Sequence, residues 1–142
     1  MTTKPVHIIS QPDKAAVLRL ALRANGVFSG VSGLMFVVGS GPLAVFIGLP
    51  SPWILITIGL SLLSYSALLF QAASRSPIDR RHAILFTAMD TLWVAGSAIL
   101  LITGWIPFTP AGKWAVIIVA DMVAVLAVFQ FIGLRRLAYP QM

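Results

Sequence analysis

The sequence of 142 residues has no cysteine and no glutamate, and it has only two histidines. Without cysteine, disulfide bonds, thiol catalysis and thiolate metal sites are excluded. Haem ligation in a membrane requires histidines within the apolar segments, but His7 lies near the N-terminus and His82 beside two arginines. No serine is spaced with a histidine and an acid as a catalytic nucleophile would be. We therefore expect no enzyme activity, no metal and no cofactor.

Charged residues are also scarce. They make up 10% of the chain, whereas hydrophobic residues make up 58%. A soluble domain of this size has about a quarter of its residues charged, which keeps its surface in water. The composition therefore predicts an integral membrane protein, and the length predicts a single domain over residues 1–142.

The apolar residues gather in four segments, each close to the ~20 residues needed to cross ~30 Å of hydrocarbon. Backbone groups cannot stay unpaired in lipid, and the segments are too long and too continuously apolar for barrel strands. The sequence therefore predicts an all-α membrane protein with four transmembrane helices. The expected spans are 18–39, 53–74, 82–104 and 113–134, after a tail at 1–11.

The two halves of the chain, about 17–75 and 82–136, repeat one pattern. Each half has an outgoing apolar segment, a turn with glycine or proline and a tryptophan, a returning apolar segment and an arginine. This internal repeat predicts two tandem helical hairpins of parallel orientation that form a bundle, related by a pseudo-two-fold axis along the membrane normal. Matching pairs include Trp53 with Trp114, Arg75 with Arg136, Asn25 with Asp90 and Gly39 with Gly104.

Basic residues mark one side of the membrane. Nine of the ten Lys and Arg lie at the N-terminus, in the middle loop or at the C-terminus, and the other two connections carry only Lys113. By the positive-inside rule this distribution predicts cytoplasmic termini in a bacterial inner membrane. It accounts for the net charge of +6 through contacts with anionic lipid headgroups, so no nucleic-acid partner is expected. The predicted anchors are Arg19, Arg23, Arg75, Arg80, Arg81, Arg135 and Arg136.

Aromatic and turn residues mark the opposite side. Trp53, Trp105 and Trp114 are expected at one depth, as an aromatic belt requires. Residues 40–52 hold an apolar stretch that is too short to cross, so we expect a bent or half-helical cover in the interface. At the other end of the first span, residues 10–13 predict a helix start, with a proline and an acid in the first turn.

Small and polar residues predict which helix faces meet. Gly26, Gly30 and Gly33 lie on one side of the first span and allow close approach of another helix. Three polar stripes are expected to face inward, leaving the large apolar residues to lipid. They contain Asn25, Ser29 and Ser32; Thr57, Ser61, Ser64 and Tyr65; and Thr87, Asp90 and Ser97.

Two aspartates fall within the spans, where a charge is costly and usually marks a function or a necessary partner. Asp90 shares its stripe with polar residues, so we expect it to point inward within reach of Asn25, Ser29 or Tyr65. A protonated carboxyl, a pairing with a neighbouring subunit, and proton or ion coupling all remain open for it. Asp121 has apolar neighbours and the repeat-mate Leu60, which predicts either a contact with another chain or an acid kept neutral.

Three sequence segments resemble a group of small, functionally uncharacterised bacterial membrane proteins with four spans. They are residues 23–33, residues 49–53 and residues 90–97, and the resemblance extends from about residue 17 to 137. The tripeptide at 51–53 is also similar to the short SPW membrane repeat. In that repeat the tripeptide belongs to the first of two helices, whereas here it opens the second. Neither resemblance implies a catalytic residue.

The sequence leaves three functions open. The first is a structural or accessory subunit that packs as a homo-oligomer or in a larger membrane complex. The second is a small oligomeric transporter coupled to protons or ions through Asp90. The third is a bundle that binds a lipid, quinone or pigment beside Phe28, Tyr65 and Trp93.

Overall fold

The fold is known from a computed structural model, which describes residues 14–139. All regular structure in this range is helical, and four of the helices are long and apolar enough to cross a membrane, so the predicted all-α membrane bundle is confirmed. The tail at 1–11 and the helix start at 10–13 lie outside the described residues. The helices are α1 (Ala16–Val38), α2 (Ser40–Ile47), α3 (Pro52–Ser74), α4 (Arg80–Thr103) and α5 (Pro110–Ala138).

The long helices follow the predicted spans closely, except that α5 is longer at both ends. It begins at Pro110 because the Thr109 side chain caps it, accepting a hydrogen bond from the backbone N–H of Gly112 at 2.9 Å. It continues past the predicted end to Ala138, with Arg135 and Arg136 in its last turn, where cations are favourable.

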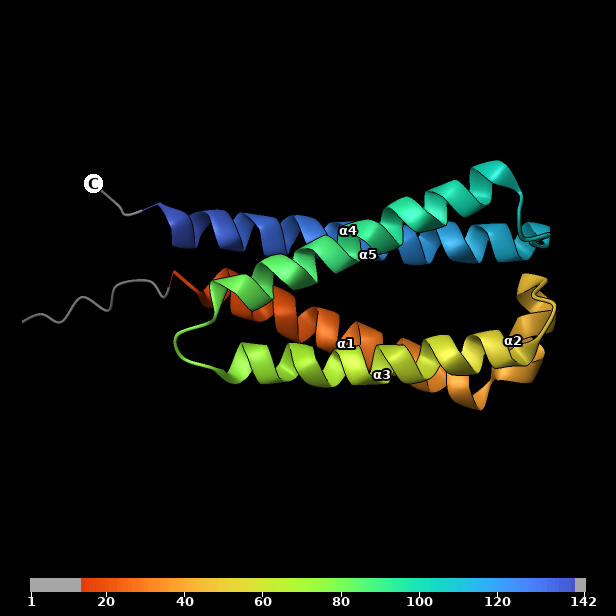
Figure 1. The fold of residues 1–142 in the computed structure, drawn as a ribbon, viewed down its shortest axis with the longest axis horizontal. Helices are drawn as coiled ribbons and strands as arrows, with labels where there is room; N and C mark the ends of the chain where they lie inside the picture. The colour runs from red at the N-terminus through yellow and green to blue at the C-terminus, as the bar shows by residue number, and fades with distance from the viewer. Residues whose placement is uncertain (1–13, 140–142) are drawn as a thin grey trace, which may run out of the picture.

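The long helices form two hairpins (Figure 1). α1 packs along most of α3, α4 packs against α5, and α1 joins the two hairpins through α5. By contrast, α3 and α4 touch only briefly, and α4 tilts away from α3 toward the end of the bundle that carries α2. The bundle is therefore splayed between α3 and α4. We call the end that carries α2 the α2 end. The opposite end, where Arg75 and Arg135 lie, is called the basic end.

The close packing of α1 on α3 depends on glycine. A Cβ atom added to Gly33 would lie 2.7 Å from the carbonyl oxygen of Gly59, and one added to Gly30 would lie 2.9 Å from Oγ of Ser66. Gly26 faces the ring of Phe70. The three glycines of the first span thus lie against α3, where the missing side chains let two backbones approach each other.

Two apolar clusters close the ends of the bundle. The cluster at the α2 end is centred on Ala44, Ile47 and Leu55, all buried. Between the two clusters lies a middle layer that contains buried polar side chains and holds the candidate site. The larger cluster, at the basic end, contains Leu18, Leu22, Leu69, Ala72, Ala73, Ile78, Ala83, Phe86 and Leu134.

The short helix α2 ties the two hairpins together at its end of the bundle. The carbonyl oxygen of Ile47 accepts a hydrogen bond from the backbone N–H of Thr109 at 3.0 Å, and the carbonyl of Phe46 accepts one from the Thr109 hydroxyl at 2.5 Å. Gly48 ends α2 in the left-handed conformation, with φ of 89°. The predicted half-helical cover is thus a complete helix whose last carbonyls hold the start of α5.

Candidate functional site

Four side chains from four different helices meet in the middle layer, and we call them the polar cluster: Asn25 of α1, Tyr65 of α3, Asp90 of α4 and Gln130 of α5. Asp90 Oδ2 accepts hydrogen bonds from Asn25 Nδ2 at 2.6 Å and from Gln130 Nε2 at 2.7 Å. Its other oxygen, Oδ1, accepts one from the Tyr65 hydroxyl at 2.9 Å. Asp90 is only 4% exposed, Asn25 1% and Gln130 0%. The carboxyl is thus enclosed by uncharged hydrogen-bond donors.

Neighbouring hydroxyls hold the two amides in position. Ser29 Oγ donates to Asn25 Oδ1 at 3.2 Å, and Thr87 Oγ1 lies 3.1 Å from Gln130 Oε1. Each amide oxygen therefore has a hydroxyl partner, while each amide nitrogen is directed at Asp90. Among the described residues, every buried side-chain nitrogen and oxygen has a hydrogen-bond partner. Since an unpaired buried polar group costs about 1–3 kcal/mol, this completeness stabilises one arrangement of the cluster.

The Tyr65 hydroxyl has two acceptors within reach. Its oxygen lies 2.9 Å from Asp90 Oδ1 and 3.1 Å from the backbone carbonyl oxygen of Phe86, one turn earlier in α4. The ring is held edge-on to the Phe86 ring, with centroids 5.6 Å apart. One hydroxyl proton can therefore point either to the carboxyl or to the carbonyl without movement of the ring.

A cavity of about 600 Å³ adjoins the polar cluster on the side facing the α2 end. Its floor contains Asn25, Ser29 and Asp90, which are buried, and its rim contains exposed residues of α3 and α4 such as Ser61 and Trp93. The cavity therefore opens through the splay between α3 and α4. Its other lining residues are Phe28, Ser32, Phe36, Thr57, Ile58, Leu62, Ser64, Tyr65, Leu68, Met89, Val119 and Val123.

The stripe of hydroxyl residues on α3 faces this cavity and not a packed helix. Thr57, Ser61 and Ser64 are exposed, although the sequence predicted an inward stripe. Each donates its proton to the backbone carbonyl four residues earlier, at 2.9, 2.9 and 3.1 Å. Because these bonds satisfy the hydroxyls within their own helix, no second helix is needed to cover them.

The second aspartate of the spans lies apart from the cluster. Asp121 is exposed on α5, as is its predicted repeat-mate Leu60 on α3. The neighbouring side chains Ile118, Met122 and Val125 are exposed as well. Asp121 thus stands on a face that would otherwise be wholly apolar.

The predicted interfacial residues lie at the two ends of the bundle. Trp53, Trp105 and Trp114 are exposed at or near the α2 end, at 70%, 78% and 67%. At the basic end, Arg19 donates to the backbone carbonyls of Ala73 and Arg75, and so caps the end of α3. The remaining predicted anchors, Arg23, Arg75, Arg80, Arg81, Arg135 and Arg136, are exposed, and the Arg135 guanidinium lies over two aromatic rings.

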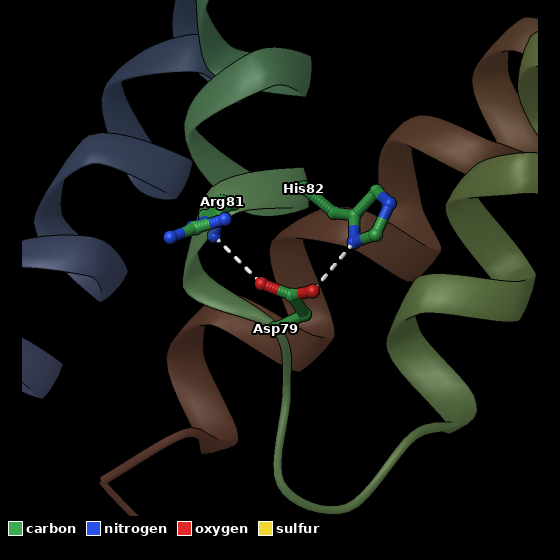
Figure 2. A network of polar contacts seen from close by, with 3 residues as sticks. All are labelled: Asp79, Arg81 and His82. Atoms are coloured by element: carbon green, nitrogen blue, oxygen red, sulfur yellow. Dashed lines mark hydrogen bonds and ion pairs between the residues drawn. The ribbon is translucent and has the colours of Figure 1, made fainter.

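Asp79 caps the start of α4, and His82 contacts it (Figure 2). One Asp79 oxygen accepts the backbone N–H of Arg81 at 2.9 Å, and the other lies 2.9 Å from His82 Nδ1. The hydrogen bond from the Arg81 N–H, followed by the contact with His82, holds the pKa of Asp79 below its ordinary value. This group stabilises the helix start and is separate from the polar cluster.

Two buried polar residues of the middle layer were missed in the sequence. Gln130 is a lone amide in the fourth span, without a polar stripe around it, and the repeat pairs it with Leu69. Leu69 and Gln130 are both 0% exposed, but this burial follows from the fold, so the sequence alone carried no signal for Gln130. Ser66, which donates to the carbonyl oxygen of Gly26 at 2.6 Å, follows Tyr65 directly and fell outside the predicted stripe.

Comparison of the chain with protein-family models, with curated proteins and with solved structures finds no match in any of the three.

Proposed function

We propose that the protein is a membrane-embedded binding protein, and that the cavity between α3 and α4 takes up a small apolar or amphipathic molecule from the bilayer. The cavity carries this proposal. Its volume of about 600 Å³ lies within the ~300–1,000 Å³ typical of small-molecule sites, which are mostly apolar with a few convergent polar groups. Here the convergent polar groups are Asp90 and its partners.

The route into the cavity supports uptake from lipid. The rim residues Ser61, Ser64, Met89 and Trp93 are exposed on two membrane-spanning helices, in the length of each helix that would lie within hydrocarbon. A molecule already dissolved in the bilayer can reach this rim without passing through water. The aromatic rings of the lining then offer flat surfaces, and the polar cluster offers hydrogen bonds to one end of the ligand.

Native mass spectrometry and a blocking substitution test this function. Ser61→Phe places a ring in the cavity and leaves the four residues of the polar cluster unchanged, whereas Ala67→Phe adds the same ring to an exposed position of α3 outside the cavity. We expect the parent and Ala67→Phe to bind the neutral probe 4-phenyl-1-butanol, followed by native mass spectrometry, and Ser61→Phe to lose it. Absence of probe binding and of any co-purified small molecule in the parent would contradict the proposal.

A second candidate function is that of a structural or accessory subunit, and Asp121 favours it. A carboxyl on a lipid-facing apolar surface is costly unless a partner covers it, and Asp121 is exposed on such a surface of α5. In this alternative a second copy or another membrane protein supplies the missing hydrogen bonds. The two candidates are compatible, since the cavity and Asp121 are on different parts of the bundle.

We further propose that the protein is a multi-pass protein of the bacterial inner membrane with both termini in the cytoplasm. The exposed arginines at the basic end support this orientation through the positive-inside rule. Contacts with anionic headgroups follow from the same residues.

A further inference from the structure

The chemistry of the cavity indicates which kind of ligand it accepts. Of the described residues, those that line the cavity include one acid, Asp90, and no lysine, arginine or histidine. An anionic ligand would therefore meet a carboxyl without a compensating cation. A cationic ligand would meet the only charge-bearing group of the cavity with the opposite sign.

The hydroxyl groups of α3 have the same preference. The protons of Thr57, Ser61 and Ser64 are donated to backbone carbonyls of their own helix. Each hydroxyl oxygen keeps lone pairs that can accept a further hydrogen bond. The wall of the cavity therefore offers acceptors in a row, which suits a ligand with N–H groups.

Aromatic side chains complete this preference. Phe28, Phe36, Tyr65 and Trp93 all line the cavity. The face of an aromatic ring attracts a cation, by ~0.5–1 kcal/mol at exposed sites and ~2 kcal/mol or more where water is excluded. An apolar cation gains both from this attraction and from burial of its hydrocarbon part.

We propose that the cavity binds a lipophilic ammonium cation, and that this cation and a proton compete for the Asp90 carboxyl. The inference rests on the binding function proposed above and names the class of ligand. It requires that Asp90 be stable both with and without a proton, and the hydrogen bonds of the polar cluster meet that requirement.

Both protonation states of Asp90 leave every polar atom of the cluster paired. In the ionised state, Oδ2 accepts the two amide N–H groups and Oδ1 accepts the Tyr65 hydroxyl. In the neutral state, Oδ1 carries the proton and donates it to the Tyr65 oxygen, while Tyr65 turns its own proton to the carbonyl of Phe86. Oδ2 keeps both amides throughout. The Tyr65 hydroxyl thus acts as the positioning group that allows a proton to leave and return.

The groups facing Asp90 from the packed helices are Asn25 of α1, Tyr65 of α3 and Gln130 of α5, with Phe86 and Thr87 on its own helix. Tyr65 is the only other titratable group among them, and within residues 14–139 no cation contacts the carboxyl. The cation and the proton therefore compete at one site, the Asp90 carboxyl. Binding of one cation is predicted to displace a single proton.

Calorimetry with a matched pair of probes tests the proposal. The first probe is 4-phenylbutylamine, which is cationic because its amine resembles that of lysine, and the second is the uncharged 4-phenyl-1-butanol. We expect the amine to bind the parent at least tenfold more tightly than the alcohol at pH 8. At lower pH, where Asp90 carries a proton, binding of each amine should release up to one proton from Asp90. The affinity for the amine should fall by up to about tenfold per pH unit as the proton displaces it, and that for the alcohol should not.

Asp90→Asn is the matched variant, because an amide can make the same contacts as the neutral carboxyl. It should bind both probes with similar affinity at every pH. If the parent binds the alcohol but shows no preference for the amine, the ammonium inference is wrong and the binding function stands. If neither probe binds the parent, the ammonium inference is wrong, and if no small molecule co-purifies with the parent either, the binding function is wrong as well. Should Asp90→Asn fail to fold, the comparison of probes on the parent decides alone.

Infrared spectroscopy tests the role of Tyr65 separately. In the neutral state, the C=O stretching band of Asp90, assigned by its absence in Asp90→Asn, should shift in Tyr65→Phe because the carboxyl proton loses its acceptor. An unshifted band would show that Tyr65 does not receive the proton and would overturn the exchange arrangement.

Discussion

Asn25 and Asp90, which the predicted sequence repeat pairs at matching positions of its two halves, hydrogen-bond to each other across the bundle, with Nδ2 2.6 Å from Oδ2. The first hairpin thus supplies an amide donor where the second supplies its acceptor. A symmetric pair of aspartates would place two acceptors opposite each other, and a symmetric pair of asparagines would carry no charge. The difference between the two residues is what gives the middle layer its single carboxyl.

The first prediction concerns the stability of the polar cluster. Asp90→Leu should lower thermal stability clearly in mild detergent, because Asn25 and Gln130 would lose their acceptor and each stranded amide costs about 1–3 kcal/mol. Asp90→Asn should unfold near the temperature of the parent. Thr91→Leu, at the adjacent exposed position, is the control. Thermal unfolding followed by circular dichroism measures all three, and equal stability of Asp90→Leu and the parent would show that the cluster contributes nothing.

The second prediction concerns the contact between α1 and α3. Gly33→Ala should destabilise the protein by about 1–3 kcal/mol, because the new methyl group meets backbone and the helices must separate. Gly30→Leu should have the same sign, since its side chain would displace Ser66. Gly96→Ala is the matched control, because a Cβ there meets nothing within 4 Å and alanine favours a helix by ~1 kcal/mol over glycine. A stable Gly33→Ala variant would contradict the close approach of the two helices.

The third prediction concerns Asp121. Asp121→Leu should leave the thermal stability of the single chain unchanged or slightly higher, because the side chain is exposed on an apolar face of α5. Any oligomer or complex that uses this face should dissociate more readily. Light scattering after size-exclusion chromatography measures the mass of parent and variant in the same detergent. Identical masses and identical sets of co-purified proteins would remove the support for the accessory-subunit function.

The fourth prediction concerns pH and the start of α4. The pKa of Asp79 lies below its ordinary value of 3.8 in the folded chain, so its ionised form stabilises the fold above that pH. The stabilisation is lost as the pH falls through the lowered pKa. Compared with Asp79→Asn, the parent should therefore have a small advantage in melting temperature above pH 3.8 that is lost as the pH falls through the lowered pKa. A difference that does not change with pH would indicate that the charge of Asp79 is irrelevant to the cap.

The fifth prediction concerns orientation in the membrane. Alkaline phosphatase fused after Pro50 or Thr109 should be active, because these positions lie at the α2 end and the enzyme works only outside the cytoplasm. Fusions after Ser76 or Tyr139 should be inactive. The opposite pattern would mean that the orientation is reversed and that the basic end lies outside the cytoplasm.

The sequence was sufficient for the helices because their length and apolar content are local properties. The sequence also predicted that Asn25, Tyr65 and Asp90 lie close together, since each belongs to a stripe of polar residues at helical spacing. Gln130 was not predicted as part of the polar cluster, because no stripe of polar residues surrounds it in the sequence. The cavity could not be predicted, because the hydroxyls of α3 bond to their own backbone and are equally satisfied beside a helix or beside open space. Only the tilt of α4 decides between these alternatives, and that tilt depends on packing along the whole bundle.

The Asn25–Asp90 hydrogen bond also helps to determine how the two hairpins align along the membrane normal. Apolar helix faces in lipid have no hydrophobic reason to prefer one longitudinal position over another, and α1 and α4 otherwise hardly touch. Sliding α1 by one turn, about 5.4 Å, would bring Ala21 or Ser29 opposite Asp90, and neither has an amide. The carboxyl would then keep fewer of its partners in a medium that supplies no replacements. This pair of side chains thus fixes the register of the two hairpins together with the Tyr65–Asp90 bond and the bonds of Thr109 to α2.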